Sequence, residues 1–506
     1  MLATEHSMRF FRDWSKRNGT ALCVCVACCI MMAGCAVGPD YHPPRSVVPE
    51  GWKGVDEPAA EPASVAVAQP LELVEWWKSF NDPLLSSLME RAIESNLDLV
   101  QAKARIRQAR ASLGVVAAGF WPEVDASASY RRSRGGGASS AGGGTAGSQA
   151  GQSSVSGGGG SETDLFRAGL DAAWELDIFG GVRRNVEASD ADILAAVEDR
   201  RDVMVSLAAE LGTDYVTLRG LQQQIAITHK NLQAQRHTAE ITRKRYEAGF
   251  VGALDVANAN AQAATTESQI PGLESSAEGV IYSMSLLLGL EPAGLARELE
   301  SEAAIPTVPP QIPVGLPSEL LRRRPDIRRA EAQLHAATAR IGVATADLFP
   351  KFSLTGSFGF SSSDLASVAN WSSRAWSFGP SVTWPIFDAG RIRSNIEVQN
   401  AIEEQTLAAY RKTVLTALKD VETALVAYAK EQEHRKALSD ALSYNTRAVE
   451  LSMKLYVAGK TDFLNVLTAQ GSLFASEDAL VQSARTLATD LIALYKALGG
   501  GWEHES

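Results

Sequence analysis

An internal duplication is the feature of this sequence that most restricts its fold. At an offset of 210 residues the second half repeats the first, in the pairs Gly169/Gly379, Trp174/Trp384, Gly180/Gly390, Arg183/Arg393 and Asn185/Asn395. The same offset aligns Tyr246–Gly249 with Tyr456–Gly459 and Leu254–Val256 with Leu464–Val466. The chain is therefore expected to contain one structural unit twice.

The offset changes upstream, which locates an insertion in the first copy. An offset of 228 aligns Asp98 with Asp326 and Pro122 with Pro350, so the first copy is longer by 18 residues. The extra residues fall in the Gly/Ser-rich tract 133–161, whose composition is that of a flexible solvated loop. The tract lacks Gly-Lys-Ser or Gly-Lys-Thr, which argues against a phosphate-binding loop.

Each copy contains two stretches with strand periodicity. In Phe352–Phe360 the even-numbered positions are mostly large and apolar, whereas the odd-numbered ones are Ser, Thr or Gly. The same alternation runs through Leu170–Ile178 and through Phe378, Val382, Trp384 and Ile386. Strands of about ten residues with one apolar and one polar face are typical of outer-membrane barrels around an aqueous lumen. For a single hairpin, a half-exposed sheet in a soluble domain is the alternative.

The number of strands decides how such a barrel can form. Four strands in one chain cannot close a barrel, because the smallest membrane barrels have about eight. An open edge in lipid would leave backbone groups unpaired at several kcal/mol each. The barrel must therefore be shared between chains, and strand counting alone allows a dimer or a trimer.

A long helical pattern follows the second strand of each copy, from about Asn185 to Ala248 and from about Asn395 to Ala458. At 1.5 Å per residue each helix would be roughly 95 Å long. The apolar positions step by four and three residues, as in coiled coils: Met204, Ala208, Leu211, Tyr215 and Leu218, then Val414, Leu418, Val421, Leu425 and Tyr428. The pattern suits the wall of a water-filled tube, and a bundle with a dry core would share it.

The first 34 residues have the pattern of a signal peptide. Basic residues precede an apolar run of about 14 residues, which is shorter than the roughly 20 that a membrane-crossing helix needs. The run ends in Met32-Ala33-Gly34-Cys35, which resembles a lipobox. Cys35 would then be the first mature residue and carry N-palmitoyl and S-diacylglycerol groups, and Ala36 fits outer-membrane sorting. A plain secretory signal with an incidental cysteine is the alternative.

Cysteine content and charge exclude several kinds of function. The other cysteines (Cys23, Cys25, Cys28 and Cys29) lie in the signal peptide, so neither a disulfide within the mature chain nor a metal site is expected. The net charge is −11, and the signal peptide carries four basic and two acidic residues, which leaves the mature chain at −13. Nucleic acid is therefore not an expected partner. The short clusters Arg322–Arg324 and Arg328–Arg329 are expected to form a solvated face or a helix-end contact.

Motifs for catalysis are also missing from the sequence. There is no His-Glu-x-x-His spacing and no Gly-x-Ser-x-Gly elbow, and the carboxylates are spread along helix faces. Asp40 and Tyr41 lie beside the expected anchor, where they favour a tether over acid–base chemistry. The chain is expected not to be an enzyme and to need no cofactor beyond the covalent lipid.

Three segments resemble one family, the TolC-like outer membrane factors, and within it the NodT-type efflux lipoproteins. They are Cys35–Tyr41 at the mature start, Leu316–Ile327 at the beginning of the second copy, and Ala497–Trp502 at the end. The resemblance covers nearly the whole mature chain. It implies an α+β membrane protein: a homotrimer whose four strands per chain form a shared 12-stranded outer-membrane barrel, continued by a periplasmic α-helical barrel.

The resemblance and the repeat together predict how the chain is divided. The expected segments are a signal peptide (1–34), an acylated extended segment (35–80), a first repeat (81–290) with a hairpin at 121–179, a linker (291–316), a second repeat (317–499) with a hairpin at 350–387, and a tail (500–506).

The family also implies a site at the periplasmic tip, at Tyr246–Asn258 and Tyr456–Gly471. Gly249 and Gly459 fit the turns between helices. Leu464 looks like the apolar gate residue, and Asp255 and Asp462 are expected either to take part in gating or to cap helices. Asn465 and Thr468 complete the predicted tip, with Thr468 at the position where relatives carry an acid that binds cations.

Three functions are compatible with the sequence. The first is a lipid-anchored outer-membrane conduit for small molecules, reaching into the periplasm to a periplasmic adaptor and an inner-membrane pump of the RND or ABC type. The second is a conduit for type I protein secretion, with the same architecture. The third, of another class, is a structural or adaptor lipoprotein, against which the duplication argues.

Overall fold

The computed structural model describes residues 36–45, 49–53, 65–67, 74–134, 162–309 and 311–502. The predicted signal peptide, Cys35 and most of the Gly/Ser-rich tract lie outside these residues. The chain divides into two compact units. We call Met1–Tyr41, Ala111–Asp190 and Ala336–Glu403 the strand unit, and His42–Arg110, Ala191–His335 and Glu404–Ser506 the helical unit.

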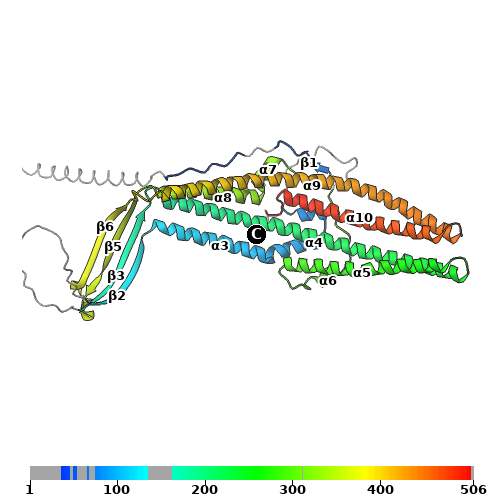
Figure 1. Cartoon of the computed structure of the whole chain (residues 1–506), viewed down its shortest axis with the longest axis horizontal. Coiled ribbons are helices and arrows are strands. Elements are labelled where there is room, and N and C mark those ends of the chain that lie inside the picture. The colour runs from blue at the N-terminus through cyan, green and yellow to red at the C-terminus, as the bar shows by residue number, and fades with distance from the viewer. Residues whose placement is uncertain are drawn as a thin grey trace, which may run out of the picture. The chain divides into compact units, whose positions relative to one another are not determined.

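Long helices and one four-stranded sheet make up most of the described chain (Figure 1). In chain order the elements are β1 (Val65–Val67), η2 (Trp76–Phe80), α2 (Pro83–Ser95), α3 (Leu97–Ala117), η3 (Ala118–Phe120), β2 (Glu123–Arg134), β3 (Glu162–Leu176), α4 (Gly181–Glu247), α5 (Ala253–Leu287), α6 (Ala296–Leu299), β4 (Gln311–Pro313), α7 (Pro317–Arg323), α8 (Pro325–Ala346), β5 (Lys351–Ser362), η4 (Leu365–Ser367), η5 (Trp371–Ser373), β6 (Arg374–Thr383), α9 (Arg391–Val457) and α10 (Phe463–Ala497).

Most equivalent elements of the two copies have matching lengths, which confirms the duplication, although β3 has 15 residues and β6 has 10. Helices α4 and α9 each have 67 residues, and α5 and α10 each have 35. Strands β2 and β5 each have 12 residues. None of the described helices combines the length and the apolar character needed to cross a membrane.

The long helices begin earlier than their apolar pattern predicted, at Gly181 and Arg391 instead of about Asn185 and Asn395. Carboxylates explain the early starts. Asp177 accepts hydrogen bonds from the backbone N–H groups of Val182 (3.1 Å) and Arg183 (2.9 Å). Asp388 accepts one from the N–H of Ile392 at 2.9 Å. Such bonds satisfy N–H groups that have no partner within a first helical turn.

The sheet has the strand order β2-β3-β5-β6, and every neighbouring pair is antiparallel. The register joins the two copies at its centre, where Gly169 of β3 lies opposite Gly359 of β5. A Cβ on Gly169 would lie 2.9 Å from the carbonyl oxygen of Phe358, so this close approach requires glycine. Within the described residues, the outer edges of β2 and β6 pair with no other strand.

The two faces of the sheet differ in polarity, as the alternation predicted. One face, which we call the serine face, carries Ser353 hydrogen-bonded to Ser381 and Ser357 hydrogen-bonded to Ser377, both at 2.7 Å. The opposite, apolar face carries large exposed side chains: Leu170, Phe358, Trp376, Phe378 and Val382.

Two strand ends were predicted wrongly. Strand β3 ends at Leu176 and does not include Ile178, and β6 ends at Thr383, before Trp384 and Ile386. Pro385 has no N–H to donate to a ladder. The indole of Trp384 instead donates to the carbonyl of Leu348 at 3.0 Å, and its repeat equivalent Trp174 donates to Phe120 at 2.9 Å.

The predicted coiled-coil seam is buried in the helical unit. Its positions on α4 are at most 2% exposed, and on α9 only Leu418 is more than 5% exposed. The seam joins a core to which η2 contributes Trp76, Trp77 and Phe80, with Trp76 stacked on Tyr495 of α10 at 5.3 Å between ring centroids. Burial of this apolar surface stabilises the helix bundle.

Replacing Leu211 with Ala should destabilise the helical unit by about 2–5 kcal/mol, because a buried side chain would leave a cavity. Leu211 is fully buried, whereas Leu194 on the same helix is 56% exposed and supplies the matched control Leu194→Ala. Denaturant unfolding followed by circular dichroism measures the difference. Equal loss of stability in both variants would contradict the assignment of the seam.

Candidate functional site: the paired tip turns

Two short turns connect the long helices, one in each copy. The first joins α4 to α5, and the second joins α9 to α10. Gly249 and Gly459 have φ values of 78° and 70°, a conformation that favours glycine. The N–H of Gly249 donates to Tyr246 at 2.9 Å and that of Gly459 donates to Tyr456 at 3.0 Å, so both helices close in the same way. Gly249 and Gly459 therefore both lie in turns between consecutive long helices.

Arg245 links the two turns within one chain. Its guanidinium donates to the carbonyl oxygen of Val457, the last residue of α9, at 2.9 Å. The same group lies 4.7 Å from the ring centroid of Tyr456 and 5.9 Å from that of Phe250. A cation placed over aromatic rings and at the negative end of a helix is stabilised by both.

Tyr456 is the buried centre of the tip. It is 1% exposed, packs against Phe463 with 5.5 Å between centroids, and donates to the hydroxyl of Thr242 at 3.4 Å. The apolar cluster around it also contains Ala239, Ala259 and Val466, so both turns share one small core. The repeat equivalent Tyr246 is 47% exposed, so the two turns are not equivalent.

The other residues predicted for the second turn lie on its surface. Leu464 is 64% exposed, and Asp462, Asn465 and Thr468 are exposed as well. Asp462 is the N-cap residue of α10, but its side chain accepts no capping hydrogen bond. The amide of Asn465 donates to Thr461 at 2.8 Å, and the hydroxyl of Thr468 donates to the carbonyl of Leu464 at 2.9 Å.

Asp255 occupies the first turn of α5, where Gly252 is the N-cap residue. A carboxylate in the first turn is favoured by the helix dipole. Asp255 is half-buried, and the exposed Leu254 beside it is the repeat equivalent of Leu464. Both turns therefore present an exposed leucine next to a polar residue, Asp255 in one and Asn465 in the other.

Arg245 was not predicted from the sequence. One signal was present: its repeat equivalent is Leu455, so the duplication breaks at this position while the following Tyr-x-Ala-Gly motif is repeated. A charged residue that replaces an apolar one inside a repeated motif indicates a contact made by only one copy.

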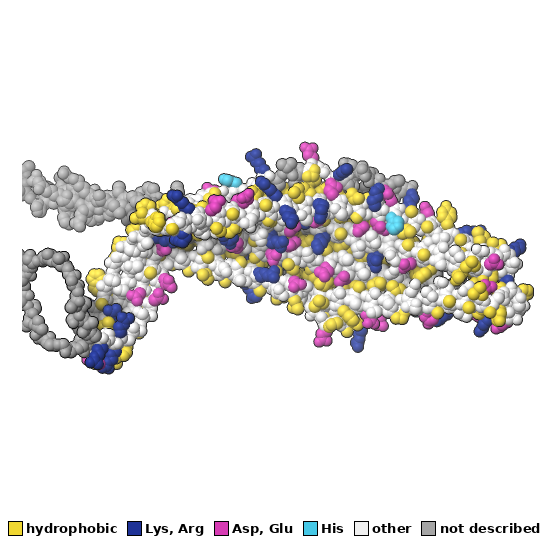
Figure 2. Space-filling model, viewed as in Figure 1, with side chains coloured by type: hydrophobic (Ala, Val, Ile, Leu, Met, Phe, Trp, Pro, Cys, Tyr) yellow, Lys and Arg dark blue, Asp and Glu magenta, His cyan; other side chains and the backbone are white. Residues whose placement is uncertain are grey.

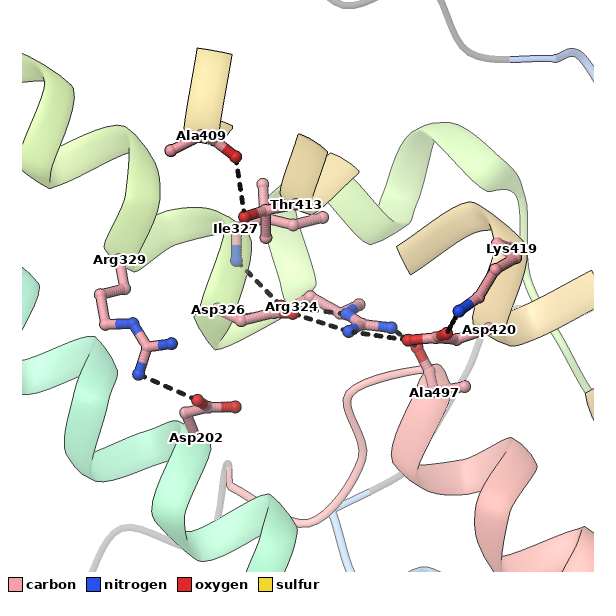
Figure 3. Close-up of polar contacts among 10 residues, drawn as sticks. All are labelled: Asp202, Arg324, Asp326, Ile327, Arg329, Ala409, Thr413, Lys419, Asp420 and Ala497. Carbon is pink, nitrogen blue, oxygen red and sulfur yellow. Dashed lines mark hydrogen bonds and ion pairs between the residues drawn. The ribbon is translucent and has the colours of Figure 1, made fainter. Parts of the chain in front are cut away.

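In the arginine cluster at the beginning of the second copy, Arg324 makes a helix-end contact, one of the two predicted roles (Figure 3). Arg324 points its guanidinium at the carbonyl of Ala497, the last residue of α10, at 2.9 Å, and at Asp326 at 2.6 Å. Arg329 forms ion pairs with Asp199 (2.7 Å) and Asp202 (3.0 Å) on α4. Arg329 therefore joins α8 to α4 of the first copy, whereas Arg324 joins the start of α8 to the end of α10 within the second copy.

The N-terminal residues are held within the strand unit. We call Ala36–Asp40 together with Gly180, Arg184 and Gly342 the N-terminal clamp. Arg184, whose side chain is 6% exposed, donates to the carbonyl of Val37 at 3.2 Å and to Asp40 at 2.6 Å. A Cβ on Gly180 would lie 2.7 Å from Cα of Ala36, so the chain passes close over this glycine. Asp40 is thus held against Arg184 at the start of α4.

Two half-buried carboxyls lie on the helices behind the tip. Burial, reinforced by the neighbouring Glu210, raises the pKa of Asp214 to about 6. Burial, reinforced by Glu431, raises the pKa of Asp490 to about 6. Both side chains are therefore protonated well below pH 6 and become charged above it.

Comparisons with known proteins agree on one family. A model of the outer membrane efflux protein family matches residues 88–289 and 316–500, one segment in each copy. The pyoverdine export outer membrane protein OpmQ of Pseudomonas aeruginosa is 32% identical over 480 residues, which cover 95% of this chain and 97% of that protein. Nodulation protein T of Rhizobium leguminosarum bv. trifolii is 30% identical over 473 residues, covering 94% and 96%. The solved structure of the outer-membrane channel OprN superposes with a TM-score of 0.83 at 36% identity, over 93% of this chain and 100% of that chain.

Replacing Arg245 with Ala should loosen the tip turns without unfolding the bundle. A hydrogen bond from a charged group is worth roughly 1.5–3 kcal/mol, so amide exchange around Val457 should become at least about tenfold faster. Hydrogen exchange with mass spectrometry measures this. The matched control is Arg243→Ala on the same helix, whose side chain is 62% exposed. If the two variants exchange alike, Arg245 does not hold the turns together.

Proposed function

Since the chain belongs to the outer membrane efflux protein family, we propose that it is the passive conduit through which a tripartite efflux system exports small molecules. Its place is the outer membrane, where it is the channel subunit of such a system. The fold is that of the trimeric outer-membrane channels, with a shared barrel continued by helices.

The observation that carries the conduit is the four-stranded sheet with two unpaired edges. Strand directions alternate, so β6 of one chain meets β2 of the next chain as another antiparallel pair. Three chains then close a ring with the apolar face toward lipid and the serine face toward the lumen. A polar lumen suits passage of hydrated solutes.

The class of cargo is supported by the relatives. Those most similar in sequence include proteins named for export of pyoverdine and for efflux of toluene, both small compounds. Protein secretion through the same architecture is the second candidate. In either case an inner-membrane pump of the RND or ABC type would supply the energy and a periplasmic adaptor would connect it, because a passive channel does no work of its own.

The gate is proposed at the tip turns. The exposed Leu464 and its repeat equivalent Leu254 would meet their counterparts from the other chains around the axis and exclude water from a narrow opening. Arg245 would hold the two turns of each chain together, and Asp255 and Asp462 would add polar contacts between neighbouring helices. The threonine hydroxyl of Thr468 offers a neutral ring where a carboxylate ring would bind cations.

Replacing Leu464 with Ser should raise single-channel conductance in planar bilayers, because a polar ring removes the apolar barrier to water. The matched control is Leu451→Ser, which changes another exposed leucine on α9 away from the turn. Light scattering confirms that the variants are trimers before the recording. Unchanged conductance in a trimeric Leu464→Ser variant would remove Leu464 from the gate, and a wild type that forms no trimer would overturn the conduit itself.

Lipid anchoring at Cys35 is also proposed. Cys35 lies outside the described residues, but the N-terminal clamp fixes the next residues, Ala36–Asp40, beside the end of β3 and the start of α4. A diacylglycerol group on Cys35 would then lie close to the base of the barrel, at the inner surface of the membrane.

Replacing Cys35 with Ala should abolish incorporation of labelled fatty acid, because Cys35 carries the only thiol left after signal cleavage. Metabolic labelling followed by immunoprecipitation measures it. The control Cys29→Ala lies in the signal peptide and should be labelled like the wild type. Persisting label in Cys35→Ala would show that the acylation site is elsewhere.

A further inference from the structure

The strand unit has a basic end. The strands join the helices at the start of β2 and at the ends of β3 and β6, so the hairpin turns lie at the opposite end of the sheet. At that opposite end lie Arg132 and Arg134 of β2 and Arg374 of β6. We call these three residues the outer arginines. Figure 2 shows Lys and Arg side chains gathered at this end of the strands.

The outer arginines belong to the apolar face of the sheet. Arg132 lies opposite Asp164 and Arg374 lies opposite Phe360, positions that share the parity of the exposed aromatics. Tyr130 and Phe166 stack on this face just inside the arginines, with 4.7 Å between centroids. Aromatic rings mark the boundary between lipid chains and headgroups in membrane barrels, so the arginines beyond them lie at headgroup level.

Closing the barrel brings the outer arginines of different chains together. Arg374 lies at the start of β6, the edge strand of one chain. Arg132 and Arg134 lie at the end of β2, the edge strand of the next chain. The two strands run antiparallel across this contact between chains, which we call the subunit seam. Their outer ends therefore meet. Each seam then carries all three guanidinium groups on the lipid-facing side.

Carboxylates do not pair with all of the outer arginines in the part of the chain that the structure describes. Arg132 pairs with Glu162 and, at 3.8 Å, with Asp164, and Arg134 lies 3.7 Å from Glu162. Arg374 donates to the carbonyl of Trp371 at 2.9 Å and lies over its ring at 5.0 Å, with no carboxylate partner in the part of the chain that the structure describes. The intervening sequence 135–161 contains no charged residue. Among the strand residues of this face, three cations therefore face two anions, in a chain whose overall charge is −11. The loop between β5 and β6 adds Asp364, whose carboxylate accepts a hydrogen bond from the N–H of Ala366.

From this arrangement we propose that each seam between subunits binds a phosphorylated glycolipid of the outer leaflet, with its phosphates on the outer arginines. Guanidinium groups suit this role because their planar N–H fork matches phosphate oxygens. The aromatic side chains below would contact the acyl chains, and the bound lipid would join two neighbouring chains. The inference rests on the shared barrel of the proposed function.

The test uses the delipidated trimer in detergent with bisphosphorylated lipid A as the ligand, and native mass spectrometry counts bound lipid. The variant Arg374→Gln should weaken binding about tenfold, and the triple variant Arg132→Gln/Arg134→Gln/Arg374→Gln should weaken it further. Arg374→Lys, which keeps the charge but loses the fork, should retain part of the affinity. Dephosphorylated lipid A and phosphatidylglycerol should bind more weakly to the wild type.

The matched control changes arginines on the serine face. Arg131 lies on β2 and Arg167 on the neighbouring β3, both with the opposite parity, so Arg131→Gln/Arg167→Gln should bind lipid A like the wild type. Equal binding by the triple variant, or equal loss in the control, would overturn the proposal, as would phosphatidylglycerol binding as tightly as lipid A. Conductance is recorded for the same samples: trimers that conduct but bind no lipid A refute this inference alone, whereas a chain that neither assembles nor conducts refutes the proposed function.

Discussion

Within the described residues, β2 and β6 leave backbone groups unpaired at the two outer edges of the sheet, and the rest of the architecture depends on this constraint. In lipid those N–H and C=O groups have no water to bind, and each would cost several kcal/mol if left alone. The sheet has an even number of strands that alternate in direction. Another chain can therefore pair in the antiparallel sense with either edge. Association is therefore part of folding for this chain. The surface of the barrel is complete only when neighbouring chains have paired their edge strands.

The same constraint accounts for the matched lengths of the two copies. Each pair of strands delivers a helix to the wall of one tunnel, and α4 and α9 both run for 67 residues before their turns. Helices of unequal length would leave the turns at Gly249 and Gly459 out of register with each other. Equal ones let Arg245 of the first turn reach the carbonyl of Val457 in the second, across 212 residues of sequence. A tip built from two turns thus requires the duplication to be kept in register over the whole helix.

Periodicity predicted what depends on which face of an element is apolar. The strand faces and the coiled-coil seam follow from alternation and from steps of four and three residues, so both could be predicted without partners in view. Periodicity carries no information on single long-range polar contacts. The bond from Arg184 to Val37 spans 147 residues, and the early start of α4 depends on the carboxylate of Asp177 outside the helix. The predicted ends of β3 and β6 were too late because the alternation of apolar and polar residues continues beyond Leu176 and Thr383. The residues that follow make other hydrogen bonds: Asp177 accepts from the first turn of α4, and Trp384 donates to Leu348.

The coiled-coil seam and the tip of the helical unit differ in how much apolar surface they bury. They therefore differ in the free energy needed to separate their helices. The seam around Leu211 belongs to a large core with fully buried leucines, methionines and a tryptophan, whereas the tip is held by a cluster of five buried residues and the bond made by Arg245. Since apolar burial contributes about 25 cal/mol per Å², the small tip core separates at far lower cost than the seam. A conduit that opens at its tip without dissociating needs this inequality. The unequal burial of the two tip tyrosines adds to it, because Tyr456 is buried whereas its repeat equivalent Tyr246 is exposed, and the polar contact of Arg245 with Val457 links the two turns.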